Sequence, residues 1–369
     1  MPPLELAVVI PTFNERDNIQ PLLDLLRQTL TGIEYEVIFV DDDSTDGTAQ
    51  AVREIASTNP QVRVLQRIGR RGLSSACLEG MMSTPARYIA VMDADLQHDE
   101  RILPAMLERL KAEKLDLVTG TRNAAGGGMG EFGAARVRLS QLGRRLSQFV
   151  SHTALSDPMS GFFMVDRRFL EEVVRSASGV GFKILLDLVA SARRPVRFAE
   201  IGYTFRQRIH GASKLDILVG IEYLQLLLDK TIGDFIPPRF VIFGMVGAVG
   251  LLLSIGVLYV LLSVFKMDFG VAQAITTVAA MTANFFLNNS LTYRDRRLRG
   301  ARVVSGLITF YAACSVGAFL NLRIAGAAKD AGFPWYAAGA AGLAIGAVWN
   351  YGVTSILTWR QVREKSTVK

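Results

Sequence analysis

Two aspartates separated by one residue follow a short apolar run in the segment Tyr88-Ile-Ala-Val-Met-Asp93-Ala-Asp95-Leu-Gln97. Such a run predicts a buried strand, and open α/β sheets bind their ligands at the carboxyl ends of strands. Two carboxylates at that position can hold a divalent cation, and the cation can in turn hold a diphosphate. The first chemical hypothesis is therefore a metal-assisted reaction of a diphosphate compound.

Acidic residues also follow two earlier apolar runs. Residues 6–12 are followed by Phe-Asn-Glu, and residues 36–40 are followed by Asp-Asp. Because the carboxyl ends of parallel strands share one edge of a sheet, these acids would meet the later aspartate pair in a single crevice. Their mutual repulsion favours a bound cation, or hydrogen bonds to a ribose and a base, at this edge.

The rest of the first half alternates between strand and helix patterns. Further strand-length runs lie at residues 62–66 and 116–119, and helical patterns lie at about 14–30, 74–82 and 101–111. This alternation predicts an α/β domain with a mainly parallel sheet and helices on both faces. The glycine-rich segment 124–130 follows a strand end, and we interpret it as an active-site loop rather than a linker.

The last third of the chain contains four long stretches with few charged residues, at about 240–265, 269–293, 303–322 and 335–359. Each has about 20 residues or more, the length that crosses the hydrocarbon core of a bilayer. Four such stretches in succession predict an all-α transmembrane domain of four spans, rather than buried helices of a soluble core.

Basic residues are distributed unevenly among the loops that join these spans. Five arginines lie between the second and third spans and four lysines or arginines follow the fourth, whereas the other loops carry little charge. This asymmetry predicts that the catalytic domain and both termini lie on the cytoplasmic side of a cell membrane. The net charge of +7 is therefore attributed to topology and to contact with membrane lipids, not to nucleic-acid binding.

These patterns divide the chain into a catalytic domain at 1–214, a linker at 215–237 and a transmembrane domain at 238–369. Within the linker, apolar residues recur at helical spacing between Leu215 and Leu228. An amphipathic helix lying in the membrane interface fits this pattern, and an ordinary core-facing helix is the alternative.

Three acidic motifs recur in a fixed order in the first half: Pro11-Thr-Phe-Asn-Glu15, Val40-Asp-Asp-Asp-Ser-Thr-Asp-Gly-Thr48 and Asp93-Ala-Asp-Leu-Gln-His98. Further motifs are Gly120-Thr-Arg122, Pro158-Met-Ser-Gly-Phe-Phe163 and Gly211-Ala-Ser-Lys-Leu215. As a set they resemble glycosyltransferase family 2 and, within it, the polyprenol (dolichol) phosphate mannose synthases. The resemblance covers about residues 5–230. It implies a GT-A fold, which is Rossmann-like, and transfer of a sugar from a nucleotide to a lipid phosphate.

The apolar stretches carry a resemblance of their own. The segments Arg239-Phe-Val-Ile-Phe-Gly and Asn284-Phe-Phe-Leu-Asn-Asn-Ser-Leu-Thr-Tyr-Arg294 are similar to the GtrA-like membrane domain, over roughly residues 238–360. Together the two resemblances imply a glycosyltransferase joined to a membrane domain.

The family resemblance assigns a donor site to the strand ends. It implies that Asp93, Asp95 and Gln97 bind Mg²⁺ or Mn²⁺ against the diphosphate of the donor. The residues implied for the nucleotide sugar as a whole are Pro11, Phe13, Glu15, Val40, Asp42, Asp93, Ala94, Asp95, Gln97 and Arg122. We interpret His98 as a polar residue at the start of a helix rather than as an additional metal ligand.

The implied acceptor, a polyprenyl phosphate, is an anion at neutral pH. It therefore needs cations that orient it and reduce its repulsion from the donor. By the family's pattern, the residues that bind it are Arg122, Arg136, Ser140, Arg208, Ser213 and Lys214. The implied catalytic set is Asp95, Arg122, Arg136, Arg208 and Lys214. Four further arginines, Arg138, Arg144, Arg145 and Arg206, lie nearby and could exchange roles with these.

The leading hypothesis is an integral membrane enzyme that transfers mannose from GDP-mannose to a polyprenyl or dolichyl phosphate on the cytoplasmic face. A single in-line displacement would invert the anomeric centre and give a β-linked product. One alternative keeps this chemistry but uses UDP-glucose or another nucleotide sugar as donor. The other is of a different class: a transporter or flippase of lipid-linked sugars whose soluble domain only binds a nucleotide sugar.

Overall fold

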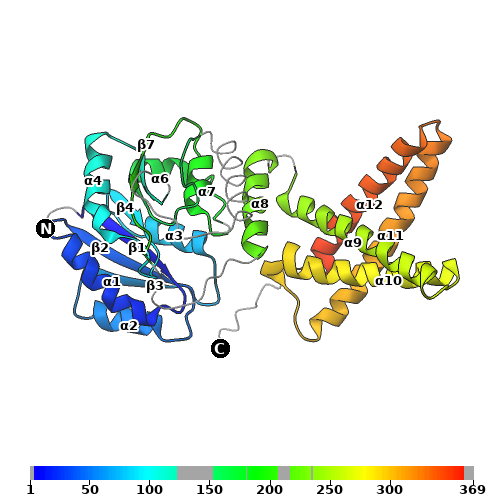
Figure 1. Cartoon of the computed structure of the whole chain (residues 1–369), viewed down its shortest axis with the longest axis horizontal. Coiled ribbons are helices and arrows are strands. Elements are labelled where there is room, and N and C mark those ends of the chain that lie inside the picture. The colour runs from blue at the N-terminus through cyan, green and yellow to red at the C-terminus, as the bar shows by residue number, and fades with distance from the viewer. Residues whose placement is uncertain (1–3, 123–152, 180, 207–216, 234–235, 361–369) are drawn as a thin grey trace, which may run out of the picture. The chain divides into compact units, whose positions relative to one another are not determined.

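The computed structural model describes residues 4–122, 153–179, 181–206, 217–233 and 236–360. The chain forms two compact units, Met1–Thr231 and Ile232–Lys369 (Figure 1). Several sequence predictions fall outside the described residues: the glycine-rich segment 124–130 and the acceptor-site candidates Arg136, Ser140, Arg208, Ser213 and Lys214. The roles of these residues stay predictions.

A seven-stranded sheet in the order β3-β2-β1-β4-β6-β5-β7 organises the first unit. Its strands are β1 (Leu6–Thr12), β2 (Tyr35–Asp41), β3 (Val62–Gln66), β4 (Tyr88–Val91), β5 (Leu117–Thr121), β6 (Phe163–Asp166) and β7 (Phe198–Gly202). Only β6 runs antiparallel to its neighbours, β4 and β5. The predicted mainly parallel sheet is therefore confirmed. Strands β6 and β7 were not predicted.

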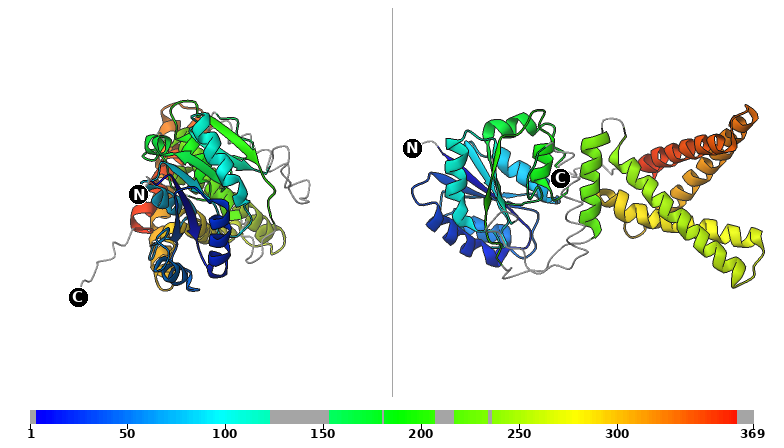
Figure 2. Two further views of the ribbon diagram at one scale, coloured as in Figure 1. Left: turned by 90° about the vertical axis from the view of Figure 1, so that its left-hand side faces the viewer. Right: turned by 45° about the horizontal axis from the view of Figure 1, so that its top comes forward.

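Helices cover both faces of this sheet (Figures 1 and 2). They are α1 (Arg16–Thr29), α2 (Thr48–Ala56), α3 (Leu73–Met82), α4 (Leu103–Ala112), α6 (Arg167–Val173) and α7 (Ile184–Ala190), with a short 3₁₀ turn, η1 (Glu100–Ile102), before α4. Alternate residues of β1 enter different cores: Val8 and Ile10 pack with α1, α2 and α4, whereas Ala7 and Val9 pack with α3, α6 and α7. This period of two is what a central strand buried on both faces requires.

Gly80 lets α3 lie directly on the sheet. A Cβ atom at this position would overlap the side chains of Val9 on β1 and Val40 on β2. Helix α3 follows β3 and precedes β4. Its close approach to the sheet therefore fixes the part of the chain that leads into β4 and the pair Asp93 and Asp95. A buried glycine with no room for a methyl group thus helps to set the position of the β4 end.

Helix α8 (Ile217–Ile232) contains most of the predicted linker. Its residues Leu226 and Leu227 pack against Leu186 of α7. The Nζ atom of Lys230 lies 2.9 Å from Oδ1 of Asp187, a carboxylate that is fully buried. The second half of α8 therefore packs on the catalytic unit in the manner of a core-facing helix.

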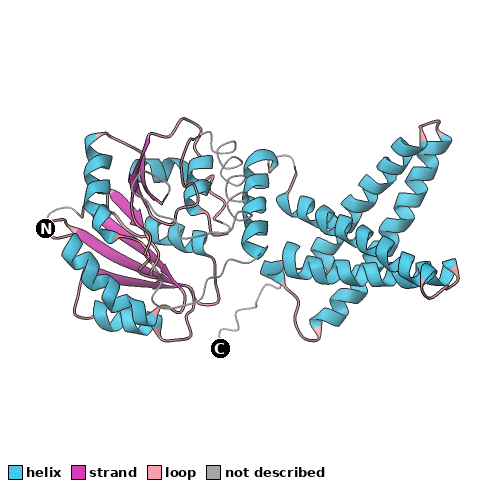
Figure 3. Cartoon of the chain, in the orientation of Figure 1, coloured by secondary structure: helices cyan, strands magenta, loops and turns pink. Residues whose placement is uncertain are grey.

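The second unit is helical, in contrast to the mixed first unit (Figure 3). Its helices are α9 (Pro238–Ser263), α10 (Phe269–Leu287), α11 (Arg302–Asp330) and α12 (Trp335–Leu357), with a π-helical turn η2 (Asn288–Thr292) and a 3₁₀ turn η3 (Arg294–Arg296) after α10. Among the described residues, four helices are long and apolar enough to cross a membrane. Leu252 and Leu322 are about 70% exposed on them, as expected for side chains that face lipid. The predicted four-helix transmembrane domain is confirmed.

In the second unit, an aromatic cluster forms where the residues that follow η2 and α12 meet. The Trp359 ring is buried and stacks on Tyr293, with ring centroids 4.1 Å apart and an interplanar angle of 6°. Its Nε1 donates to Oδ1 of Asn289 at 3.1 Å, and the same oxygen accepts from the backbone of Leu298 at 2.8 Å. The polar side chain of Asn289 in η2 thus binds the segment that follows α12, and its amide is paired where an unpaired amide would be costly.

Candidate active site

Asp93 and Asp95 lie just beyond the end of β4, as the sequence predicts. The Asp95 side chain is buried, whereas the Asp93 side chain is 39% exposed. Leu96 between Asp95 and Gln97 has a φ of +62°, a left-handed conformation that a leucine adopts only under strain. The turn places the Gln97 N–H 3.2 Å from Oδ1 of Asp95. Strain of this kind at a strand end is typical of a binding site.

Gln97 is fixed to the backbone that follows β7. Its Nε2 donates to the Arg206 carbonyl at 3.1 Å, and the Arg206 N–H donates to the Gln97 carbonyl at 2.9 Å. Because the amide nitrogen is engaged, the amide oxygen Oε1 is the atom that could serve as a ligand. This agrees with the metal-binding role that the resemblance implies for Gln97.

His98 binds Asp93 and is buried. Its Nε2 lies 3.1 Å from Oδ2 of Asp93, and its Nδ1 lies 2.7 Å from the Tyr203 hydroxyl. Burial raises the pKa of Tyr203, so that hydroxyl keeps its proton at neutral pH. The interpretation of His98 as a polar residue at a helix start fits its place just before η1, but the sequence did not predict that its ring is only 4% exposed with partners on both nitrogens. Tyr203 lies 105 residues away, so no local pattern could reveal this contact.

The β1 and β2 ends are joined into one loop structure. Asn14 and Asp43 both adopt positive φ, +58° and +59°. The Asn14 N–H donates to Ser44 Oγ at 2.9 Å, and the Thr45 N–H donates back to Asn14 Oδ1 at 3.0 Å. The Glu15 N–H donates to a threonine hydroxyl at the start of α2, also at 3.0 Å. Much of the second acidic motif therefore shapes the loop.

Asp42 has internal partners. It forms an ion pair with Arg67 at 2.9 Å and accepts from the Gly72 N–H at 2.6 Å. Burial raises the pKa of Asp42, although the Gly72 N–H and the Arg67 charge act in the opposite direction. Strands β2 and β4 both run parallel to β1 and pair with it on opposite sides. Acids from β2 and β4 therefore lie at the same edge, on either side of β1.

The remaining donor-site candidates lie at the β1 and β2 ends. Pro11 and Val40 are paired to each other in the β1–β2 register and are buried. The Phe13 ring is half-buried and carries the Arg71 guanidinium 4.1 Å from its centroid. A ring that already stacks on a planar cation has the shape that a nucleobase would also need.

Arg122 is the acceptor-site candidate within the described residues. It binds Asp157 through Nε at 3.0 Å and Nη2 at 2.9 Å, both to Oδ2, and its guanidinium lies 5.1 Å from the centroid of Phe205. The orientation of Arg122 is thus fixed from two sides. Two N–H groups of one rigid guanidinium converge on this oxygen, a geometry that lysine cannot reproduce.

Lys183 is a half-buried cation that the sequence analysis did not consider. It precedes α7, and burial lowers its pKa, partly opposed by Asp157. Arg122 and Asp93 also act on it electrostatically. The only sequence signal was a lone lysine directly before an apolar helix, which also fits an ordinary surface charge.

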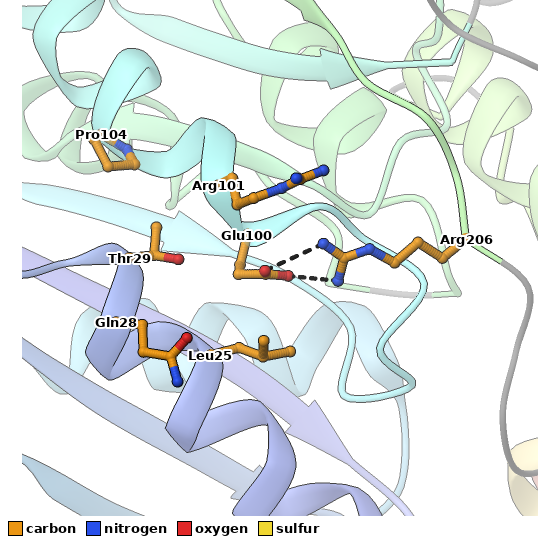
Figure 4. A pocket seen from close by; sticks show the side chains of 7 residues that line it. All are labelled: Leu25, Gln28, Thr29, Glu100, Arg101, Pro104 and Arg206. Carbon is orange, nitrogen blue, oxygen red and sulfur yellow. Dashed lines mark hydrogen bonds and ion pairs between the residues drawn. The ribbon is translucent and has the colours of Figure 1, made fainter.

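Arg206, one of the arginines that could have exchanged roles, has a different function in the fold. Its guanidinium binds Glu100 at 2.7 Å (Figure 4). It also binds Asp99 at 3.0 Å. The pair borders a groove of about 640 Å³ between α1 and the start of α4. The groove is lined by Leu25, Gln28, Thr29, Glu100, Arg101, Pro104 and Arg206. The acid pair of β4 does not line it.

The donor set at the β4 end fits a hard divalent cation. Two carboxylates and one amide oxygen are the atoms that Mg²⁺ and Mn²⁺ prefer. Among the described residues, no group of three His, Cys, Asp or Glu side chains is placed to hold a metal. An incomplete protein set suits a cation whose other ligands are water and the phosphates of a substrate.

Comparisons with known proteins agree with this geometry. The profile described as "Glycosyl transferase family 2" matches residues 7–174, and "GtrA/DPMS, transmembrane domain" matches residues 242–359. A dolichol-phosphate mannosyltransferase of Pyrococcus furiosus is 30% identical over 366 residues, 96% of this chain and 99% of the relative. A protein of the same name from Saccharomyces cerevisiae is 36% identical over 249 residues, 65% of this chain and 92% of the relative.

A solved structure is also similar. The glucosyl-3-phosphoglycerate synthase of Mycobacterium tuberculosis, crystallised with Mn²⁺, UDP-glucose and phosphoglyceric acid, aligns at 22% identity with a TM-score of 0.45. The alignment covers 62% of this chain and 80% of that chain.

The fold and the site define a GT-A-type glycosyltransferase attached to a transmembrane domain. The chain belongs to glycosyl transferase family 2, with curated relatives that are dolichol-phosphate mannosyltransferases, and its second unit is a GtrA/DPMS transmembrane domain. The predicted family, fold class and enzymatic nature are confirmed, and the protein is an integral membrane enzyme.

Proposed function

We propose that this enzyme transfers mannose from GDP-mannose to a polyprenyl phosphate of the dolichyl type. The observation that carries the proposal is the acid pair Asp93 and Asp95 at the β4 end, with Arg122 on the same Phe205 ring as the His98 that binds Asp93. Asp157 fixes Arg122. An acid pair that can hold a cation beside a fixed arginine suits a reaction between two phosphate compounds. The names of the relatives supply the sugar and the lipid.

On the donor side, Asp93, Asp95 and Gln97 would hold Mg²⁺ or Mn²⁺ against the diphosphate. The bound cation would supply charge neutralisation to the nucleoside diphosphate as it leaves. The remaining donor residues, Pro11, Phe13, Glu15, Val40, Asp42 and Ala94, would surround the nucleoside. Phe13 would provide the stacking surface, since its ring already accepts a planar guanidinium.

On the acceptor side, cations perform the work that a general base performs in many transferases. The lipid phosphate is already an anion, so it attacks without losing a proton. Arg122 would bind it, held in position by Asp157 and Phe205. The other residues proposed for the lipid phosphate are Arg136, Ser140, Arg208, Ser213 and Lys214.

The reaction would be a single displacement. A phosphate oxygen of the lipid forms a bond to the anomeric carbon while the bond from that carbon to the diphosphate breaks, and GDP departs with the electron pair. Attack from the face opposite the leaving group inverts the centre, so an α-linked donor gives a β-linked lipid product. Orientation of the two reactants and relief of their charge repulsion supply the rate enhancement.

The reaction would take place on the cytoplasmic side of the membrane. The arginines Arg294, Arg296, Arg297 and Arg299 lie between the second and third membrane helices, and Arg302 begins the third. Two crossings before this loop would put it on the side of the membrane where the catalytic domain lies. Positive loop charge favours the cytoplasmic side.

The test is transfer by the purified full-length protein in detergent. The protein is incubated with Mn²⁺, polyprenyl phosphate and radiolabelled GDP-mannose or UDP-glucose, and label in the organic phase is measured. We expect transfer from GDP-mannose, its loss with EDTA, and its loss in Asp95→Asn. Transfer only from UDP-glucose would replace the donor, and movement of lipid-linked sugar without any transfer would identify a transporter.

A further inference from the structure

We propose that His98 and Tyr203 position the Asp93 carboxylate, so that the protein binds Oδ2 and leaves Oδ1 for the cation. This inference rests on the proposed function, because the cation belongs to that function. Neither residue is assigned a role by the sequence motifs. Both are positioning residues, since they act through Asp93.

The direction of the hydrogen bonds follows from the chemistry of the three groups. An ionised carboxylate only accepts, so the His98 Nε2 that lies 3.1 Å from Asp93 must carry a proton. In neutral imidazole the other nitrogen, Nδ1, is then an acceptor. The Tyr203 hydroxyl at 2.7 Å therefore donates to it. The chain runs from Tyr203 through His98 to Asp93 and fixes one tautomer.

The surrounding rings hold this arrangement in place. The His98 ring centroid lies 5.1 Å from that of Phe162 and 5.6 Å from that of Phe205. The same Phe205 lies under the Arg122 guanidinium. One aromatic cluster therefore supports both the metal-side carboxylate and the phosphate-side arginine.

Gly161 limits Asp93 from the other direction. A Cβ atom there would lie 2.9 Å from Oδ2, closer than real Cβ atoms approach an oxygen. Oδ2 is thus confined between the His98 ring and the Gly161 backbone. Within the described part of the chain, Oδ2 has a hydrogen-bond partner and Oδ1 remains for a cation. Outer hydrogen-bond partners give metal-binding carboxylates this arrangement.

The first measurement is Mn²⁺ affinity of the full-length protein with GDP, by electron paramagnetic resonance. His98→Phe removes the donor to Asp93, and we expect Mn²⁺ affinity to fall about 10- to 100-fold, the usual cost of losing such a partner. His98→Gln can place an amide N–H near the Nε2 position and should restore part of the affinity. Tyr203→Phe should weaken it less than His98→Phe. Tyr35→Phe, at the start of β2, is the control and should change nothing.

The second measurement needs no metal. The chain has three histidines, so ¹⁵N-histidine NMR can resolve the His98 tautomer once the other two are substituted. We expect the Nε2–H tautomer in the parent protein and a mixture of tautomers in Tyr203→Phe. A His98 that protonates Nδ1, or a His98→Phe variant that melts early but binds Mn²⁺ normally, would overturn the proposal. A protein with the expected tautomer that binds no Mn²⁺ would instead overturn the proposed metal-dependent function.

An independent observation concerns the membrane unit: we infer that it is a tandem repeat of one helical hairpin. The segment from Asn284 to Arg294 matches the segment from Asn350 to Arg360 in position and chemistry. The matched pairs are Asn284 and Asn350, Phe285 and Tyr351, Leu291 and Leu357, Thr292 and Thr358, Tyr293 and Trp359, and Arg294 and Arg360. On the preceding helices, buried Phe243, Val246 and Gly250 match buried Phe310, Ala313 and Gly317 at equal spacing.

The contacts that these residues make also repeat between the two hairpins. A Cβ atom on Gly250 would overlap the Asn284 amide, and one on Gly317 would overlap the Asn350 amide. The backbone carbonyl of each asparagine accepts a hydrogen bond from the side chain four positions later. Asn288 Nδ2 donates to Asn284 at 2.9 Å, and Thr354 Oγ1 donates to Asn350 at 2.6 Å. Equivalent residues in equivalent contacts indicate two copies of one unit.

The two copies meet through equivalent residues. Tyr293 and Trp359, which occupy the same place in each copy, are the stacked pair described above. A contact between equivalent positions is what a two-fold arrangement of the hairpins produces.

Matched glycine variants test the repeat. Gly250→Ala and Gly317→Ala should each lower the melting temperature in detergent by several degrees, because each added methyl group meets an asparagine. Adding Asn284→Ala to Gly250→Ala, or Asn350→Ala to Gly317→Ala, should restore much of the lost stability. Each asparagine change should rescue only the glycine variant of its own hairpin. Gly247→Ala and Gly326→Ala, which have open space around them, are the controls. Loss and rescue in one hairpin but not in the other would overturn the inference.

Discussion

At the scale of single residues, the contact between the Arg122 guanidinium and the Asp157 carboxylate provides a test of the acceptor site. Arg122→Lys keeps the charge but loses the two-nitrogen contact with Oδ2. A hydrogen bond to a charged group contributes about 1.5–3 kcal/mol, so transfer should fall about 10- to 100-fold. Initial rates at saturating donor measure this. Arg168→Lys, on α6, is the control, and an unchanged rate in Arg122→Lys would remove Arg122 from the site.

Gly161→Ala probes the space beside Asp93. The added methyl group would sit 2.9 Å from Oδ2, so the carboxylate must move. We expect a higher Mn²⁺ concentration for half-maximal transfer, with a smaller change at saturating Mn²⁺. Gly32→Ala provides the contrast: its φ of +83° makes it strained but the space is open, so stability should fall and Mn²⁺ dependence should not change.

The acid pair could be predicted because its two residues lie together in the sequence after one apolar run. The contacts of His98, Tyr203 and Asp157 could not, because they form only when distant segments meet. The contact between Arg122 and Asp157 spans 35 residues. Asp42 was assigned to the donor site on motif grounds, and the structure shows in addition its ion pair with Arg67.

At the scale of elements, Asp116 links the start of β5 to the segment before β7. Burial raises its pKa, but hydrogen bonds from Arg194 and Arg197 outweigh that effect and lower it to about 2. The pKa in the folded state is thus below the unfolded value of about 4, so the stabilisation is complete above that pH and is lost as pH falls towards 2. We expect Asp116→Asn to lower the melting temperature at pH 7 and to flatten its fall between these two pH values.

Thermal unfolding followed at a series of pH values measures the effect. Asp17→Asn in α1, an exposed aspartate, should leave the curve of the parent protein unchanged. If Asp116→Asn kept the same acid limb as the parent protein, another group would have to be responsible for it.

Helix α8 depends on one buried ion pair. Lys230 binds Asp187, and Asp187 also accepts from Ser178 and Gly179. Lys230→Met leaves that carboxylate buried without its cation, and breaking such a pair costs about 3–5 kcal/mol. We expect a clear fall in the melting temperature in detergent. Lys111→Met, which breaks a half-exposed pair with Glu5, should cost less than about 1 kcal/mol.

The elements themselves differ in how readily the sequence reveals them. The membrane helices were predictable, because lipid demands about 20 apolar residues in a row and few other structures do. Strand β6 was not, because Phe163–Asp166 is a run of four residues. Its antiparallel direction depends on pairing with β4 and β5, which no local pattern encodes.

At the scale of the whole molecule, the two units are built for different solvents: the first for water and the second for lipid. The first buries two apolar clusters on either side of a sheet, as a water-soluble domain does. The second exposes leucines and phenylalanines along four helices, which only a bilayer can cover. The donor is soluble in water and the acceptor is a lipid. Because the second unit holds the enzyme in the membrane, the enzyme meets its acceptor by diffusion within the bilayer.

This arrangement predicts which loops face which side of the membrane. With four spans, the loops after α9 and after α11 lie on one face, and the loop after α10 lies on the face of the catalytic domain. We replace Cys77 and Cys314 by serine and introduce one cysteine at a time, Met267→Cys, Phe333→Cys or Arg299→Cys. An impermeant maleimide added to intact cells should label the first two, and Arg299→Cys only after the membrane is opened. The reverse pattern would put the catalytic domain outside the cell, where the positive-inside rule does not place it, and would contradict a cytoplasmic donor.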